Sequence, residues 1–238
     1  PTSFNFLACD LKHLFLAALL LVYMTAWAGP FEDAYEREDY ATALRILRPL
    51  ATLGLNSSAQ YNIGLMYAKG QSVVQDDAEA IKWYRLAAAQ RHASAQNNLG
   101  LIYANGHGVV RDYVEAVKWY RLAAAQRNAS AQYNLGLMYD NGQGVEQDSA
   151  EAVKWYRLAA GQGDETAQNN LGLMFHHGRG VVQDHVRAHM WLNLAATKGY
   201  ADAAKNLDMV AKRMTTQQLE EAEKLARECM ARNFNGCS

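Results

Sequence analysis

The sequence predicts an all-α solenoid of antiparallel helix pairs, and three observations support this fold class. A stretch of 36 residues recurs, and its first helical alanine falls at Ala59, Ala95, Ala131 and Ala167. Each copy carries a tryptophan and two glycines in the same register. Half of the 238 residues are apolar, and only 3 are prolines. A repeat of this length indicates units that bury their apolar faces against neighbouring units.

Each unit has the pattern of two helices joined by a glycine-containing turn. In the second copy, Ala95, Leu99 and Tyr103 lie four residues apart and share one helix face. Gly106 follows, at a position suited to the left-handed conformation that ends a helix. The next segment has an apolar stripe of its own, formed by Ala116, Trp119, Ala123 and Ala124.

Capping residues predict where the helices begin. Second helices follow an aspartate with a glutamate three residues on, a pair that can satisfy free amide groups at a helix start. These pairs are Asp76 with Glu79, Asp112 with Glu115, and Asp148 with Glu151. Candidate caps of first helices are Asn56, Asn128 and Asp164, and Thr215 with Gln218 predicts a capping box on the last helix.

A glycine inside the first helix of each copy predicts close contact between helices. Glycine in a helix interior costs about 1 kcal/mol relative to alanine, so we expect Gly100 to serve packing. Trp119 and Tyr103 are expected to fill the space beside it. A large side chain at Gly100 should therefore clash with the neighbouring helix.

These residues together carry a family resemblance. The run A-x-x-x-LG-x-x-Y-x-x-G-x-GV-x-x-D-x-x-x-A-x-x-WY-x-x-AA, from Ala95 to Ala124, resembles the Sel-one-like repeat, a relative of the tetratricopeptide repeat. The resemblance covers four full repeats, from about Asn56 to Gly199. It implies a right-handed superhelix that holds a protein or peptide on its concave face. It implies no particular partner, because one fold can host unrelated functions.

The repeat pattern divides the chain into seven segments. We assign a signal peptide to 1–28, an N-terminal capping half-repeat to 30–55, full repeats to 56–91, 92–127, 128–163 and 164–199, and C-terminal capping helices to 200–238. Terminal units are expected to be atypical because one of their sides meets water. In the N-terminal half-repeat, the expected buried face is Ala41, Leu44, Leu47 and Leu50.

The N-terminal segment predicts export to the periplasm or secretion. The apolar run 14–24 follows Lys12 and precedes the small residues Ala26 and Ala28. This pattern is typical of a signal peptide. The run is shorter than the roughly 20 residues that span a bilayer, so no stable membrane insertion is expected after signal removal. An uncleaved anchor is the alternative.

The cysteines fit an oxidising compartment. Of 3 cysteines, Cys9 lies in the predicted signal peptide, which leaves Cys229 and Cys237 in the mature chain. They are a candidate disulfide that would tie the C-terminal tail to the last helix. The alternative is two free or intermolecular thiols.

Composition and motifs argue against catalysis and against nucleic-acid binding. The formal net charge is -1, so the chain lacks the basic footprint of a nucleic-acid binder. Some secreted members of the resembled family are associated with penicillin binding, but no Ser-x-x-Lys motif is present here. Helix starts account for Ser58, Ser94, Ser130 and Ser149. We therefore expect no enzyme and no cofactor.

Partner-binding residues are expected on the first helices, which the resemblance places on the concave face. Side-chain amides there can pair with a peptide backbone, while tyrosine and methionine offer apolar contact. The candidates are Tyr61, Asn62, Met66, Asn97, Asn98, Ile102, Tyr133, Asn134, Met138, Asn169, Asn170 and Met174, with Leu65, Leu101, Leu137 and Leu173 beside them. The alternative is that the apolar members belong to the core and that asparagine recurs through duplication.

The preferred function is an exported, non-enzymatic scaffold that binds a protein or peptide. One alternative is a binder or hydrolase of cell-wall fragments. Another is a metal-responsive module using the fourth-repeat histidines, His176, His177, His185 and His189. His189 stands where the other repeats have Ile81, Val117 and Val153, which favours a core role and no metal.

Overall fold

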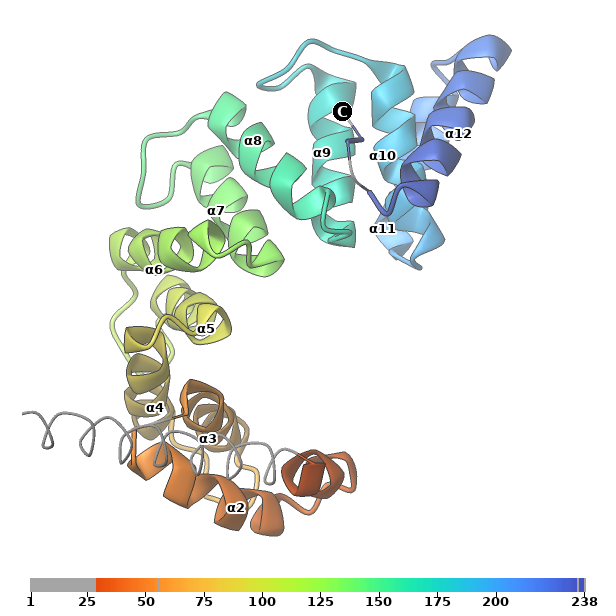
Figure 1. Cartoon of the computed structure of the whole chain (residues 1–238). Helices are drawn as coiled ribbons and strands as arrows, with labels where there is room; N and C mark the ends of the chain where they lie inside the picture. The colour runs from red at the N-terminus through yellow and green to blue at the C-terminus, as the bar shows by residue number, and fades with distance from the viewer. Residues whose placement is uncertain (1–28, 55, 235, 238) are drawn as a thin grey trace, which may run out of the picture. The chain divides into compact units, whose positions relative to one another are not determined.

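The described part of the chain is helical. The computed structural model describes residues 29–54, 56–234 and 236–237, and no strand occurs within these ranges. The predicted signal peptide, 1–28, lies outside them. The described helices (Figure 1) form two units, which divide between Ala87 and Ala88. The predicted class, an all-α array of helix pairs, is confirmed.

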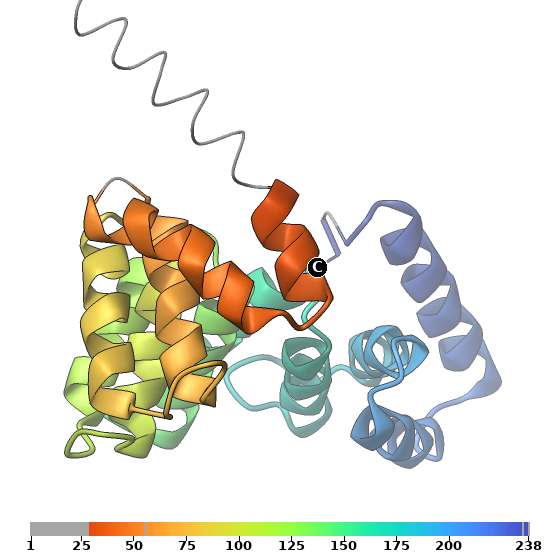
Figure 2. The ribbon, with the colours of Figure 1, turned by 90° about the horizontal axis from the view of Figure 1, so that it is seen from below.

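Unit 1 contains a short helical segment at residues 29–36, then α2 (Tyr40–Thr52), α3 (Ser57–Lys69) and the greater part of α4 (Asp77–Ala89). Its core packs α2 against α3 through Ala43, Leu47, Ala51, Ala59, Ile63 and Met66. Figure 2 shows α2 in orange, on the outer side of this unit, after the orange-red segment 29–36.

The predicted buried face of α2 is partly wrong. The buried residues are Ala43, Ile46, Leu47 and Ala51, whereas Ala41 is exposed and Leu44 and Leu50 are only half-buried. The physical reason is helix geometry. A spacing of three residues drifts around a helix of 3.6 residues per turn, while the steps of three, one and four between the buried residues stay on one side.

Unit 2 consists of three helix pairs and two terminal helices. The pairs are α5 (Ala93–Asn105) with α6 (Tyr113–Ala125), α7 (Ala129–Asn141) with α8 (Ser149–Ala160), and α9 (Glu165–His177) with α10 (His185–Thr197). Consecutive pairs pack through α6 on α7 and α8 on α9 (Figure 1). The terminal helices α11 (Ala201–Ala211) and α12 (Thr216–Ala231) both pack on α10. We call the first helix of each repeat helix A and the second helix B.

The predicted helix caps are present. Asn56, Asn128 and Asp164 each accept a hydrogen bond from the backbone N–H three residues on, and Thr215 forms its capping box with Gln218. Helix α5 begins differently, because His92 Nδ1 accepts from the N–H of Ala95 at 3.3 Å. One half of the predicted aspartate–glutamate device is wrong. The Asp112 carboxylate caps α6, but Glu115 pairs with Lys118 at 2.8 Å instead of returning to the cap.

The glycine positions meet two separate needs. Gly106 ends α5 with φ of 77°, in the left-handed region, as predicted. The glycines inside helix A permit close contact with helix B, also as predicted, but the neighbouring side chain was predicted wrongly. A Cβ built on Gly136 would lie 2.7 Å from the ring of Tyr156, and Gly100 faces the ring of Tyr120 in the same way. Tyr120 is buried, whereas Trp119 and Tyr103 are only half-buried.

Candidate functional site

The candidate site of unit 2 is a row of partly exposed side chains on its A helices. Amide and apolar side chains recur there on α5, α7 and α9, beside the buried stripe. We call this row the helix-A surface, and its members are Asn98, Leu101, Ile102, Tyr133, Asn134, Leu137, Asn170 and Leu173. In unit 1, α3 carries Tyr61, Asn62 and Leu65, which are also partly exposed.

Three predicted contact residues belong to the core instead. Met66, Met138 and Met174 are 0%, 6% and 3% exposed, so their side chains do not reach a partner. Each lies three residues after the buried leucine or isoleucine of its helix A and therefore shares its face. The sequence placed them beside the core stripe, whereas the structure includes them in it.

Two predicted asparagines are committed to contacts between repeats. Asn97 and Asn169 are buried, and their Oδ1 atoms accept hydrogen bonds from Nδ2 of Asn134 at 3.1 Å and Nδ2 of Asn206 at 2.9 Å. Each bond joins one helix A to the next. Because a buried amide without a partner costs about 1 to 3 kcal/mol, these amides stabilise the array and are not free to bind a peptide backbone.

The equivalent contact between α7 and α9 uses a tyrosine in place of the first asparagine. Burial raises the pKa of Tyr133, and a hydrogen bond from the side chain of Asn170 opposes that rise. Tyr133 thus stands where Asn97 and Asn169 stand in their repeats, and its ring packs 6.0 Å from that of Tyr156. The part of the helix-A surface left to a partner is therefore apolar with amides at its margin.

The sequence analysis did not predict a row of buried glutamines. Gln96, Gln132 and Gln168 donate through Nε2 to the carbonyls of Ala88, Ala124 and Ala160 at 3.1 to 3.2 Å, near the end of the preceding helix B. In unit 1, Gln60 donates to the carbonyl of Ala51. The signal was present, because a glutamine follows the first alanine of every repeat. Each glutamine adds a second hydrogen bond to a carbonyl that already accepts from a backbone N–H of the turn, and so ties helix A to the preceding helix B.

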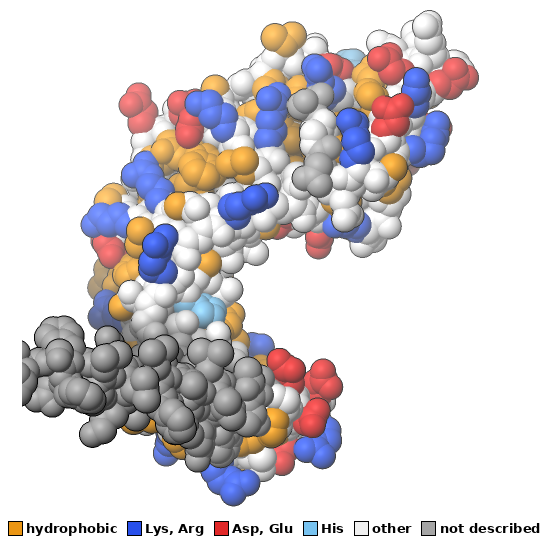
Figure 3. All heavy atoms as spheres, in the orientation of Figure 1, with side chains coloured by type: hydrophobic (Ala, Val, Ile, Leu, Met, Phe, Trp, Pro, Cys, Tyr) orange, Lys and Arg blue, Asp and Glu red, His pale blue; other side chains and the backbone are white. Residues whose placement is uncertain are grey.

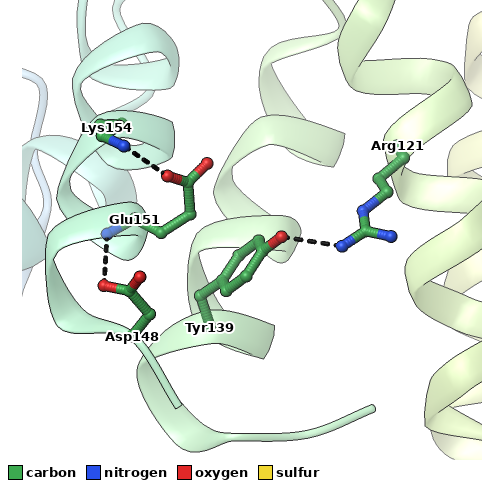
Figure 4. A network of polar contacts seen from close by, with 5 residues as sticks. All are labelled: Arg121, Tyr139, Asp148, Glu151 and Lys154. Carbon is green, nitrogen blue, oxygen red and sulfur yellow. Dashed lines mark hydrogen bonds and ion pairs between the residues drawn. The ribbon is translucent and has the colours of Figure 1, made fainter. Parts of the chain in front are cut away.

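A hollow lies between α6 and the turn that joins α7 to α8. Arg121 Nη2 donates to the Tyr139 hydroxyl at 2.8 Å, and Arg157 stacks 5.5 Å from the ring of Phe175 one repeat later. Figure 4 shows the first pair beside Asp148, which caps α8, and the Glu151–Lys154 ion pair. The hollow there has a volume of about 620 Å³. In its lining, Arg121 bonds to Tyr139 and Asp148 caps α8, which indicates a structural role for these groups.

Charges of both signs are spread over unit 2. Figure 3 shows basic and acidic side chains interspersed over α6 to α12, with apolar side chains gathered over α7 and α8. Such a surface has no field of one sign that would select a strongly charged ligand. This distribution agrees with the formal net charge of -1.

The fourth-repeat histidines form a cluster inside unit 2. The ring of His176 lies 4.7 Å from that of His177 and 5.0 Å from that of His185. His176 and His189 are buried, and desolvation lowers the pKa of both. Within residues 29–54, 56–234 and 236–237, no three histidine, cysteine or acidic side chains form a group that could hold a metal ion.

The two C-terminal cysteines are joined in the structure. Cys229 and Cys237 form a disulfide with a Cα–Cα distance of 5.4 Å. The tail between them returns to the turn after α8, where Phe234 contacts Gly163 and lies 4.7 Å from the ammonium group of Lys198.

The helices of the described residues include none that is both long and apolar enough to span a bilayer.

These features define a helical-repeat protein of the solenoid class. The sequence model of the Sel1 repeat matches residues 57–92, 93–128, 129–164 and 166–200. The chain therefore belongs to the Sel1 repeat family, and the predicted resemblance is confirmed. Proteins built from these repeats are generally non-catalytic scaffolds for protein interactions.

Solved structures of similar proteins support this family assignment. The c5321 protein, a protective antigen present in uropathogenic Escherichia coli strains, is 36% identical over 83% of this chain with a TM-score of 0.76. This chain spans only 42% of that protein. A Sel1 repeat protein from Oxalobacter formigenes is 35% identical over 76% of this chain and 75% of its own, with a TM-score of 0.67. No curated protein matches this chain.

Proposed function

We propose that this protein is an exported, non-enzymatic scaffold that binds a protein or extended peptide through its helix-A surface. The observation that carries the proposal is the recurrence, in register on α5, α7 and α9, of partly exposed leucine beside asparagine or tyrosine. Leu101 is 37% exposed and has equivalents in Leu137 and Leu173. A partner that runs across consecutive helices would meet the same apolar contact once in each repeat.

The geometry favours apolar contact with peripheral hydrogen bonds over recognition of charge. Asn97 and Asn169 are occupied by hydrogen bonds between repeats, and Asn170 by its bonds to Tyr133 and Asn169. Amide contact to a partner therefore falls to Asn98 at the margin. Side-chain amides can donate to and accept from a peptide backbone at once. This arrangement suits a peptide or protein segment with apolar side chains and no requirement for net charge.

Binding by wild type, a surface variant and an outer-face control tests this proposal. Leu101→Glu alters the helix-A surface, and Leu122→Glu alters the outer face of α6, where Leu122 is 50% exposed. We expect partners captured from an envelope extract by wild type and by Leu122→Glu to be lost with Leu101→Glu. Equal capture by all three folded proteins would contradict the proposal. Circular dichroism and thermal melting would first establish that both variants fold.

Export is a separate part of the proposal. It is supported by the apolar run 14–24 with small residues before Gly29 and by the Cys229–Cys237 disulfide, a type of bond that persists in oxidising compartments. Cell fractionation with mass analysis of the recovered chain tests it. We expect protein outside the cytoplasm that begins near Gly29, with no free thiol. A full-length chain in the cytoplasm with reduced cysteines would contradict it.

A further inference from the structure

Helices α4, α6 and α8 share a Glu–Lys ion pair that α2 and α10 lack. Glu79–Lys82, Glu115–Lys118 and Glu151–Lys154 bridge at 2.6 to 2.8 Å on the outer faces of α4, α6 and α8. Each lysine lies six residues after the aspartate at the helix start. Counted in the same way from the capping residues Asp39 and Asp184, the lysine position is Arg45 in α2 and Met190 in α10.

On α10, this face is covered by another helix of the chain. Met190 and Leu194 are 3% and 1% exposed because α12 packs over them. Helix α12 meets α10 with small residues, since its buried positions are Ala222, Ala226 and Cys229. In this molecule, therefore, a helix-B face that lacks the ion pair is covered by an amphipathic helix.

The corresponding face of α2 carries a hollow. A volume of about 550 Å³ is lined by Ala41, Leu44, Arg45, Arg48, Pro49 and Thr52. Pro49 stands at the register position of Leu194, and Arg45 at that of Met190. Every residue that lines this hollow belongs to α2, and one of them, Leu44, also packs against the core between α2 and α3. Among the residues that the structure describes, no salt bridge engages Arg45 or Arg48.

The faces of α2 and α10 differ in charge and therefore suit different helices. The face of α10 has Met190 and Asn193 where α2 has Arg45 and Arg48, so α2 offers two exposed guanidinium groups beside the apolar hollow. Arginine prefers a carboxylate partner because two parallel hydrogen bonds can form. A helix that lies on α2 as α12 lies on α10 would therefore gain from glutamates flanking its apolar stripe.

We propose that the α2 hollow binds an amphipathic helix of a partner protein, one with small apolar residues about four apart and glutamates beside them. This surface is separate from the helix-A surface and does not depend on the function proposed for it. Helix α12 has the required pattern, since the exposed Glu220, Glu221 and Glu223 surround Ala222. Its sequence therefore supplies a suitable probe.

The test measures binding of a labelled synthetic peptide to the full chain. The peptide has the sequence of residues 216–231 with Cys229→Ala, blocked ends and a fluorescent label, and fluorescence anisotropy reports its binding. We expect saturable binding that weakens tenfold or more when Arg45→Glu and Arg48→Glu are combined. The matched control combines Lys118→Glu and Arg121→Glu, which occupy the same register positions on α6, and should bind as wild type does.

A charge-reversed peptide makes the test specific. With lysine in place of Glu220, Glu221 and Glu223, the peptide should bind wild type poorly and regain affinity for the double glutamate variant. Leu101→Glu on the helix-A surface should leave peptide binding unchanged. Chemical cross-linking of the bound peptide would then locate it on the chain. The proposal would be overturned by absence of saturable binding, by an equal loss of affinity in the α6 control, or by cross-links to α10 instead of α2.

Discussion

The outer faces of α10 and of α6 and α8 occupy the same place in their repeats but behave differently. Leu122 and Leu158 are each 50% exposed, whereas the equivalent Leu194 is 1% exposed. The difference follows from neighbouring positions. Lys118 and Lys154 are paired with glutamates on α6 and α8, while Met190 replaces them on α10 and admits α12. The change of Lys154 and Glu151 to Met190 and Arg187 thus accompanies the change from a solvated face to one that a capping helix covers.

The comparison also shows how the array ends. Helix α12 packs on α10 and so turns back over the last full repeat, instead of extending the array with α11 as a further pair. A helix placed in the same way on α6 or α8 would have to desolvate a Glu–Lys pair, which costs free energy. On α10 the apolar Met190 stands in place of that lysine, and α12 packs on this helix.

The largest effect is expected from a charge placed under the capping helix. Leu194→Glu should destabilise the protein by about 3 to 5 kcal/mol, because it buries a carboxylate without a partner. Leu158→Glu at the equivalent exposed position should change stability by less than about 0.5 kcal/mol. Urea denaturation of both variants measures the contrast. Similar losses in the two would show that the fourth-repeat face is not distinct.

A smaller effect is expected from removing the disulfide that holds the end of the cap. Replacing Cys229 and Cys237 by serine together should cost about 2 to 3 kcal/mol, the value expected from the chain entropy of a short closed loop. Hydrogen exchange should increase in α12 and in the turn at Gly163, which Phe234 contacts, with α5 to α7 unchanged. Increased exchange throughout unit 2 would contradict a local role.

The glycine–tyrosine packing that three repeats share can be tested at one glycine. Gly136→Ala should destabilise by about 1 to 3 kcal/mol, because its Cβ would lie 2.7 Å from the ring of Tyr156. In a Tyr156→Ala background the same change should be neutral or stabilising, since alanine favours helix and the ring is absent. A double-mutant cycle by thermal melting measures this coupling. Additive losses would mean that the ring is not the obstacle.

The smallest effect concerns the cap of α5. Burial lowers the pKa of His92 below its ordinary value of 6.5, so the folded state binds a proton less readily than the unfolded chain. The neutral cap therefore contributes fully above pH 6.5 and is lost as the pH falls through the lowered pKa. Melting at pH 7.5 and 5.0 should show a smaller acid loss in His92→Asn than in wild type. An equal loss would exclude this cap as a contributor.

Much of the fold could be predicted because the repeat states its pattern four times. The 36-residue period, the aspartate and asparagine caps and Gly106 depend on local rules that a single helix or turn satisfies. The neighbour of Gly100 could not be predicted in this way. Tryptophan and tyrosine are adjacent in helix B, and only the crossing of the two helices decides that Tyr120 faces the glycine.

The candidate site was harder to predict for a similar reason. Periodicity placed Asn97 and Asn134 on one face but could not show that the bond joins positions 37 residues apart, one more than the period. That offset arises from how one repeat packs on the next. The same packing buries Met138, which a helix considered alone would leave at the margin of its apolar stripe.

The most direct test of the central claim is site-specific photo-crosslinking in the native cell. A photoreactive phenylalanine analogue would replace Leu101 on the helix-A surface or Leu122 on the outer face of α6, both partly exposed. The proposed function predicts a discrete cross-linked partner from position 101 and none from position 122. A partner captured only from position 122, or no discrete product from position 101 in a folded protein, would contradict it.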